Sequence, residues 1–421
     1  MANSIQQMMQ DMHTLIQNAM IATPKGSKPQ SIAALEFPGT PVVPEDYDDR
    51  GLSEPLVSLL DTGAALDIVH SAKGTHLFAL YGQILENAEL PPGRELTSDE
   101  QIKLNKAQLY IKQNAKTYAK YNARLMEAKG KLARAKDSDE RHTAQQTIRE
   151  IEIEWDGHGR TDYEGYVKTI RRLQRSSPAS YFIAAKQTYD EYFADDCVRI
   201  LPAVWYSTED EQLSWMEMEC AQNSQSSSTA SRTTSTDKVL KEYYQKTDFW
   251  SKVKGWFGIK STQEVSTSVQ QTVEKTNREF SSCGLSMKWE MMRVSVQRPW
   301  LDLGVLAVDG LKLAGVSPGA YSSGQLSWEN RGLLPGYITG FIVARNISMD
   351  MHVSKDMADV LEDNSHSITC GPFHLGKNCT VEKVQNDSSE SRDNIHLRIK
   401  VNGGAQMIGY IITPFPRFPT A

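Results

Sequence analysis

The side chains best suited to bind a metal ion lie close together near the C-terminus. They are His366, Cys370, His374 and Cys379. Imidazole and thiolate groups are the ligands that structural zinc sites use. In a continuous strand, however, residues four positions apart lie roughly 13 Å apart, which is too far for one shared ion. Gly371 and Gly376 could bend the segment enough to bring the ligands together. We keep the four residues as a weak zinc candidate and otherwise expect no metal and no cofactor.

A second chemical pattern is the run Gly315-Val316-Ser317-Pro318-Gly319, which has the G-x-S-x-G spacing of a hydrolase nucleophile. The residue after such a serine must lend its backbone N–H to the oxyanion hole. Here that residue is proline, which has no N–H. The run is therefore a turn. The sequence contains no phosphate-binding glycine motif either, so we predict a protein that is not an enzyme and identify no small-molecule substrate.

Residues 237–260 combine aromatic and basic side chains in a way that suits the surface of a membrane. On a helix, most of the large apolar residues fall on one face, while Lys241, Lys252 and Lys254 lie off that face. Aromatic rings favour the membrane–water interface, and ammonium groups there meet lipid headgroups. We predict the following membrane-contact or intersubunit residues: Val239, Tyr243, Trp250, Val253, Trp256 and Phe257.

Two segments that flank this tip are predicted to be strand-like arms, residues 211–236 and 261–298. The first begins with Met216, Met218 and Cys220 alternating with glutamates and continues as a Ser/Thr tract over 224–236. Such a tract is compatible with a strand but has little to anchor it in a core. In composition, this region resembles the Ser/Thr-rich insertion hairpins of aerolysin-type toxins. The resemblance is confined to residues 211–298, and it implies a β-barrel pore built from several copies of the hairpin.

Three interpretations of the region stay open. The hairpin inserts its tip into a membrane, or it is a fixed arm that pairs with neighbouring subunits in a filament, ring or shell. Alternatively, the Ser/Thr tract is a low-complexity loop that precedes a helix. The first arm carries almost no apolar residue beyond Ala230 in its Ser/Thr tract, so only the tip could face lipid.

The N-terminal segment, residues 1–22, is predicted to be an amphipathic docking helix. Its apolar residues recur at helical spacing and include Ile5, Met8, Met12, Leu15 and Ile16. Methionine adapts to irregular grooves, so the helix suits docking onto another surface. The alternative is that it folds back on its own core. Residues 23–50 are predicted to be a linker or extended arm.

The next segment, residues 51–196, is predicted to be a helical domain. Thr97 and Glu100 form a capping-box pattern that opens a long helix, and a second helix follows after residue 137. Their apolar seam has near-heptad spacing, which indicates an antiparallel, coiled-coil-like hairpin. The long β-hairpin then covers 197–300, and alternating strands over 301–421 indicate a C-terminal antiparallel β-sandwich. The predicted class is therefore α+β.

Composition narrows the function further. The chain has 421 residues, 39% of them apolar, and a net charge of −6. No run of 18 apolar residues could form a membrane-spanning helix, and the first residues lack the pattern of a signal peptide. We therefore expect synthesis in the cytoplasm, with release by a non-classical route as an alternative. The five cysteines are too widely spaced for a disulfide framework.

The helix predicted over 98–137 is basic, with ten Lys or Arg and four Asp or Glu. It lacks an array of aromatic residues for base stacking, so a nucleic-acid partner is disfavoured. We expect a homo-oligomer that is membrane-active and forms pores. The alternative is a structural protein that self-assembles through its N-terminal helix and Ser/Thr-rich hairpin.

Overall fold

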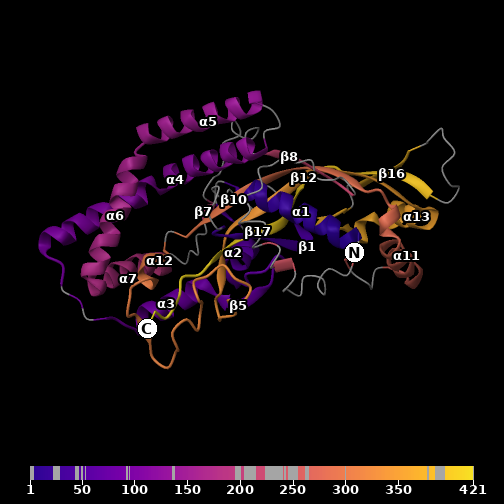
Figure 1. The fold of residues 1–421 in the computed structure, drawn as a ribbon. Helices are drawn as coiled ribbons and strands as arrows, with labels where there is room; N and C mark the ends of the chain where they lie inside the picture. Colours follow the sequence, from indigo (N-terminus) through magenta and orange to yellow (C-terminus); the bar gives the residue numbers. More distant parts are fainter. Residues whose placement is uncertain are drawn as a thin grey trace.

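The fold combines one large antiparallel sheet with a lobe of long helices, as Figure 1 shows for a computed structural model. The α+β class predicted from the sequence is thereby confirmed. The structure describes residues 4–21, 29–42, 47–48, 51–52, 54–91, 93, 95–134, 138–194, 201–202, 215–222, 240, 243–244, 255–260, 265–298, 300–376, 379–384 and 394–420.

The sheet is organised around one long strand, β12 (Gly336–Ser354). One edge of β12 pairs with β10 (Ser286–Gln297), and the other edge pairs first with β17 (Ala405–Pro414) and then with β16 (Asn394–Val401). Asn346, which has a positive φ of 51°, lies where β17 gives way to β16. Asparagine tolerates this left-handed conformation better than most residues.

Shorter strands extend the same sheet at its margins. β1 (Ile32–Val42) forms one end of the sheet beside β17, and β7 (Leu201–Pro202) pairs with β10 at the other end. β8 (Met216–Ala221) also pairs with β10, and β15 (Cys379–Lys383) with β16. The remaining members are β4 (Thr62–Ala64) and β5 (Ala72–His76).

The N-terminal helix α1 (Ser4–Met20) covers part of this sheet. Its predicted apolar stripe is real, because Ile5, Met8, Met12 and Ile16 are buried and Leu15 packs against the same core. The core they join is that of their own chain, which is the fold-back alternative. Docking of this helix onto another molecule stays a prediction.

The helical lobe begins after the short helices α2 (Glu54–Asp61) and α3 (Leu77–Asn87). α4 (Ser98–Arg134) opens with the predicted capping box: the Thr97 N–H donates to Glu100 Oε2 at 3.0 Å, and the Glu100 N–H donates to Thr97 Oγ1 at 3.4 Å. α5 (Ser138–Gly157) then packs back along α4 through an aromatic cluster that includes Tyr121 and Trp155. Two long helices thus pack together in the region where the sequence predicts a helical hairpin.

Two further helices return the chain toward the sheet. Gly159 has a φ of 89°, a left-handed conformation that ends the hairpin and lets α6 (Arg160–Ser176) cross α4. α7 (Pro178–Ala194) follows and packs on α3 and on the short helix α12 (Leu303–Leu306). The predicted helical domain 51–196 is not purely helical, because β4 and β5 lie inside it and belong to the main sheet.

The second predicted arm, 261–298, is wrong over its first half, where α11 (Thr267–Arg278) is a helix. Ser266 caps it by accepting a hydrogen bond from the Val269 N–H at 3.4 Å. Val269 and Val273 fit an alternating strand pattern, but they are also one helical turn apart. The short 3-10 helix η2 (Phe280–Ser282) follows, and strand structure begins only at β10. The Ser/Thr tract 224–236 lies outside the described residues.

A separate C-terminal sandwich is not confirmed, since β12, β15, β16 and β17 pair in the same sheet as β1, β4 and β10. Three small sheets accompany the main one. The first sheet consists of β9 (Phe257–Ile259), β13 (Ile368–Cys370) and β14 (Phe373–His374). In the second, β6 (Ala88–Glu89) pairs with β11 (Lys312–Leu313). In the third, β2 (Tyr47–Asp48) pairs with β3 (Gly51–Leu52). α13 (Lys355–Asn364) and the 3-10 helix η3 (Ser365–Ser367) precede β13.

Candidate functional site

The predicted membrane-contact residues that the structure describes lie inside the protein. Tyr243 and Trp256 are each 1% exposed, and Phe257 is 3% exposed. Phe257 begins β9, so the segment is not helical at that point. The other three residues, Val239, Trp250 and Val253, lie outside the described part of the chain. Tyr243, Trp256 and Phe257, which the sequence marks for an interface, are therefore part of the core in this structure.

The residue next to Tyr243 is bound directly by the N-terminal helix. The hydroxyl of Tyr244 lies 2.7 Å from Nδ1 of His13 and 3.1 Å from Oγ1 of Thr14. The two rings of His13 and Tyr244 meet edge to face, with their centroids 5.7 Å apart. The predicted docking helix and the predicted aromatic tip thus contact each other within one chain.

The hydrogen bonds of His13 define its tautomer. Nε2 lies 2.7 Å from the carbonyl oxygen of Ala33, and a carbonyl can only accept, so Nε2 carries the hydrogen. In the neutral ring Nδ1 is then an acceptor, and the Tyr244 hydroxyl donates to it. Burial lowers the pKa of His13 to about 4, while the Ala33 carbonyl and the charge of Asp67 act in the opposite direction. His13 is therefore neutral at pH 7.

Gln17, one helical turn after His13, completes the contact with β1. Its Oε1 accepts from the Ala33 N–H at 2.7 Å, and its Nε2 donates to the Ser31 carbonyl at 3.3 Å. β1 lies at the end of the main sheet path, so its outer backbone groups have no neighbouring strand at this point. Two buried polar side chains of α1 satisfy them, which explains why His13 and Gln17 interrupt an apolar stripe.

We use the name aromatic segment for residues 240–257. A second set of hydrogen bonds holds its C-terminal end. Asn277, near the end of α11, accepts from the N–H groups of Trp256 and Phe257 at 3.0 and 2.9 Å. Its Nδ2 donates to the Phe257 carbonyl at 2.9 Å. A side chain at Gly255 would collide with this amide, because a Cβ there would lie 2.3 Å from the Asn277 nitrogen. The amide thus replaces a neighbouring strand for residues 256–257.

No protein-family description, curated protein or solved structure matches this chain. Among the helices that the structure describes, none is both long enough and apolar enough to cross a membrane. The function must therefore be argued from the geometry of this chain alone.

The weak zinc candidate finds no support, since the described residues contain no group of three metal-binding side chains. Cys370 and His374 lie in β13 and β14, and Cys379 lies in β15 of the main sheet. Burial raises the pKa of Cys370 well above its usual value and that of Cys379 to about 11. His366, in η3, completes the candidate set.

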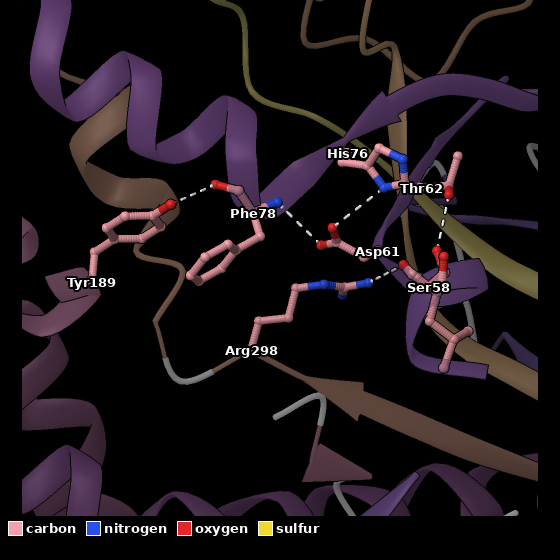
Figure 2. Close-up of polar contacts among 8 residues, drawn as sticks. Ser58, Asp61, Thr62, His76, Phe78, Tyr189 and Arg298 are labelled. Atoms are coloured by element: carbon pink, nitrogen blue, oxygen red, sulfur yellow. Dashed lines mark hydrogen bonds and ion pairs between the residues drawn. The ribbon is translucent and has the colours of Figure 1, made fainter. Parts of the chain in front are cut away.

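Sequence reasoning missed a buried polar cluster that joins the sheet to α2 and α3 (Figure 2). The guanidinium of Arg298 donates to the carbonyls of Leu60 and Ile338 at 2.7 and 2.6 Å. Asp61 accepts from the Phe78 N–H at 3.1 Å, and its other oxygen lies 3.7 Å from Nδ1 of His76. Nothing in the sequence distinguishes this buried arginine from an exposed one.

The chemistry of this cluster is structural. Burial raises the pKa of Asp61 to about 6, against the opposing effects of the Phe78 N–H, Arg298 and His76. A carboxyl group in that range beside an imidazole could move protons. The carboxylate, however, caps α3 (Figure 2), and the guanidinium donates to two backbone carbonyls. We therefore regard the contact between α1 and the aromatic segment as the better functional candidate.

Proposed function

We propose that this protein is a non-enzymatic, oligomer-forming, membrane-active protein and that the described fold is its closed form. The observation that carries the proposal is the bond between His13 of α1 and Tyr244, with Tyr243 buried beside it. In this form Tyr243, Trp256 and Phe257 are hidden from lipid. Opening means that α1 leaves the sheet and that residues 240–257 become free to reach a membrane.

The chemistry of the contact suits a helix that can detach. Its polar part includes hydrogen bonds made by His13, Thr14 and Gln17, and a hydrogen bond from Arg293 of β10 to the Met20 carbonyl at 3.0 Å. Its apolar part is rich in methionine, which packs adaptably and loses less on repacking than a branched side chain. The released segment would present aromatic rings together with lysines, the combination that favours an interface.

A disulfide lock tests whether α1 must move. Cys220 Sγ of β8 lies 3.9 Å from Met8 Sδ of α1, so Met8→Cys places a second thiol opposite a native one. We expect the oxidised variant to lose the ability to release dye from anionic vesicles, and reductant to restore it. Burial raises the pKa of Cys220 to about 12, so a chemical oxidant is needed to form the bond.

The matched control is Met8→Cys in a Cys220→Ala background, which has the same helix change but cannot form the cross-link. Formation of the bond is checked by mass spectrometry before the vesicles are added. Equal dye release by the locked and reduced forms would contradict the closed-form proposal. So would the absence of dye release by the wild-type protein from pH 4.5 to 7.5, with and without limited proteolysis.

A second candidate is a structural protein that assembles without lipid. One observation favours it: α1 satisfies the outer N–H and C=O groups of Ala33 in β1, so its departure would open a strand edge to another copy. The opened edge is short, since residues 68–70 already cover Leu35. Regular particles in lipid-free solution, seen by light scattering and electron microscopy, would support this candidate over the first.

A further inference from the structure

The outer face of α4 carries a straight stripe of exposed side chains. The stripe follows alternating steps of four and three residues, which keeps it on one side of the helix. Ile102 and Leu109 within it are 65% and 56% exposed, among the most exposed large apolar residues of the described chain. The stripe, which we call the α4 stripe, consists of Ile102, Lys106, Leu109, Gln113, Lys116 and Lys120.

The side chains of the α4 stripe face away from the described core and are exposed. The residues of α4 that pack inward are on the other side of the helix and include Leu104, Tyr121 and Leu125. At 1.5 Å per residue, the stripe from 102 to 120 is roughly 27 Å long. It lies on the lobe that projects from the sheet, away from α11 and α13 (Figure 1).

Charge sets this face apart from the rest of the chain. The chain has a net charge of −6, yet α4 has no Asp or Glu between Gln101 and Met126. Two basic residues of that stretch, Lys112 and Arg124, form ion pairs with Glu191 and Glu154. Both of those pairs lie off the stripe. The stripe is therefore a local basic surface on an acidic protein, and its complement is an anionic surface.

The composition of the stripe selects among anionic partners. Two exposed aliphatic side chains contribute nothing to a contact with nucleic-acid phosphates, and the stripe has no aromatic ring on which a base could stack. Pairing of the stripe with itself in a second copy would bring lysines against lysines. A membrane surface satisfies both residue types, because ammonium groups meet anionic headgroups while aliphatic side chains enter the interface.

We infer that the α4 stripe is the surface by which this protein first meets anionic lipid headgroups. The inference rests on the proposed membrane function and deepens it, since it names the lipid class and the residues of first contact. The closed form needs such a surface, because Tyr243, Trp256 and Phe257 are buried in it. Binding through α4 is separate from the movement of α1, so the two steps can be measured separately.

The test is flotation of the full-length protein with vesicles of phosphatidylcholine alone or with about a third phosphatidylserine. We expect binding to the phosphatidylserine vesicles only, with a steep loss at high salt. Lys106→Glu with Lys116→Glu should weaken this binding by roughly tenfold or more. Ile102→Ser with Leu109→Ser should also weaken it, but without changing its salt dependence.

The matched control is Lys275→Glu with Lys355→Glu, in α11 and α13 at the far end of the molecule. Each Lys→Glu change lowers the net charge by 2, so both double variants change it from −6 to −10. Equal binding by the wild type and the Lys106/Lys116 variant would overturn the inference, as would equal weakening by the control. Preferential binding to duplex DNA, or lipid-independent self-association that these lysines control, would overturn it as well.

Failure of the inference can be told apart from failure of the proposed function. Dye release by the Lys106/Lys116 variant is compared with that of the wild type, both at equal bound protein and at equal total protein. If the two proteins release dye equally in both comparisons, the α4 stripe is not the lipid-binding surface, and the closed-form proposal is unaffected. Lysine-dependent binding without dye release under any condition has the opposite meaning. It retains the stripe as a lipid-binding surface and removes the proposed membrane activity.

Discussion

At the scale of single residues, His13 makes the closed form sensitive to acid. Burial lowers the pKa of His13 from 6.5 to about 4. Between pH 6.5 and pH 4, His13 is therefore protonated in the unfolded chain but neutral in the folded chain. The contribution of His13 to the free energy of unfolding has its full value above pH 6.5 and declines as the pH falls toward 4. The loss is about 3 kcal/mol by pH 4.

The variant His13→Gln isolates this effect, because an amide can bond to Ala33 but does not titrate. We expect the wild type to be more stable than the variant at pH 7.5 and this advantage to shrink steadily between pH 6.5 and pH 4. Urea unfolding at several pH values measures it. Asp61 changes stability in the opposite direction, since its pKa is raised to about 6, but it is common to both proteins and cancels. An advantage that stays constant with pH would contradict the prediction.

Asn277 is the second residue on which the aromatic segment depends. Asn277→Ala removes three hydrogen bonds to the backbone of Trp256 and Phe257 and leaves those groups buried. We expect a loss of about 2–4 kcal/mol in the free energy of unfolding and faster amide exchange at both residues. Ser268→Ala, at an exposed position of the same helix, is the control and should change stability little. Unchanged exchange at Trp256 would show that the amide does not hold the segment.

The sequence could mark the aromatic residues but could not say what they face. Apolar side chains on one helical face fit a lipid surface, a neighbouring subunit and a protein core equally well, and the structure places Tyr243, Trp256 and Phe257 in the core. The sequence does contain one signal of this packing. His13 and Gln17 are polar residues one turn apart inside an apolar stripe, a pattern typical of buried side chains that bond to backbone groups.

At the scale of elements, the sequence is most informative where a local rule applies. The capping box at Thr97 begins α4, and Gly159 ends the helical hairpin. The same rules fail for α11, because the alternating pattern of Val265, Thr267 and Val269 competes with a helical one. The N-cap at Ser266 decides in favour of the helix, and a capping serine is a weak signal where residues 261–268 hold several other Ser and Thr residues.

Arg298 joins two elements that no local rule connects, the end of α2 and the middle strand β12. Its guanidinium is buried, and burial lowers its pKa to about 10 without making it neutral at pH 7. Arg298→Lys cannot reach both carbonyls with one ammonium group. We expect this change to cost about 2–4 kcal/mol in chemical denaturation, whereas Arg331→Lys, on the surface, should cost less than about 1 kcal/mol. An equal loss of stability in the two variants would mean that the two hydrogen bonds of the Arg298 guanidinium are not needed.

At the scale of the whole molecule, the predicted domain boundaries are not confirmed, because the main sheet takes strands from several of the predicted segments. β1 pairs with β17, so segments near the two ends of the chain lie side by side, and β4 joins the same sheet from within the predicted helical domain. Such pairings depend on long-range contacts that a local hydrophobic pattern does not contain. The sequence therefore supports the class of the fold and several elements, but not the way they combine.

Removal of residues 1–22 tests the whole molecule, because α1 covers buried residues of the sheet and the outer groups of Ala33 at once. We expect the truncated chain to elute as larger species in size-exclusion chromatography with light scattering, since an apolar surface and a strand edge both become free. Circular dichroism checks that it still folds. Full-length Leu15→Ser, which changes a half-buried residue of α1, is a milder control and should remain near the wild-type size.

A truncated chain that stays monomeric with an unchanged unfolding midpoint would show that α1 does not cover the sheet. Larger species that are regular in the absence of lipid would favour self-assembly as the function. Larger species that release dye from vesicles only when anionic lipid is present would favour the membrane function.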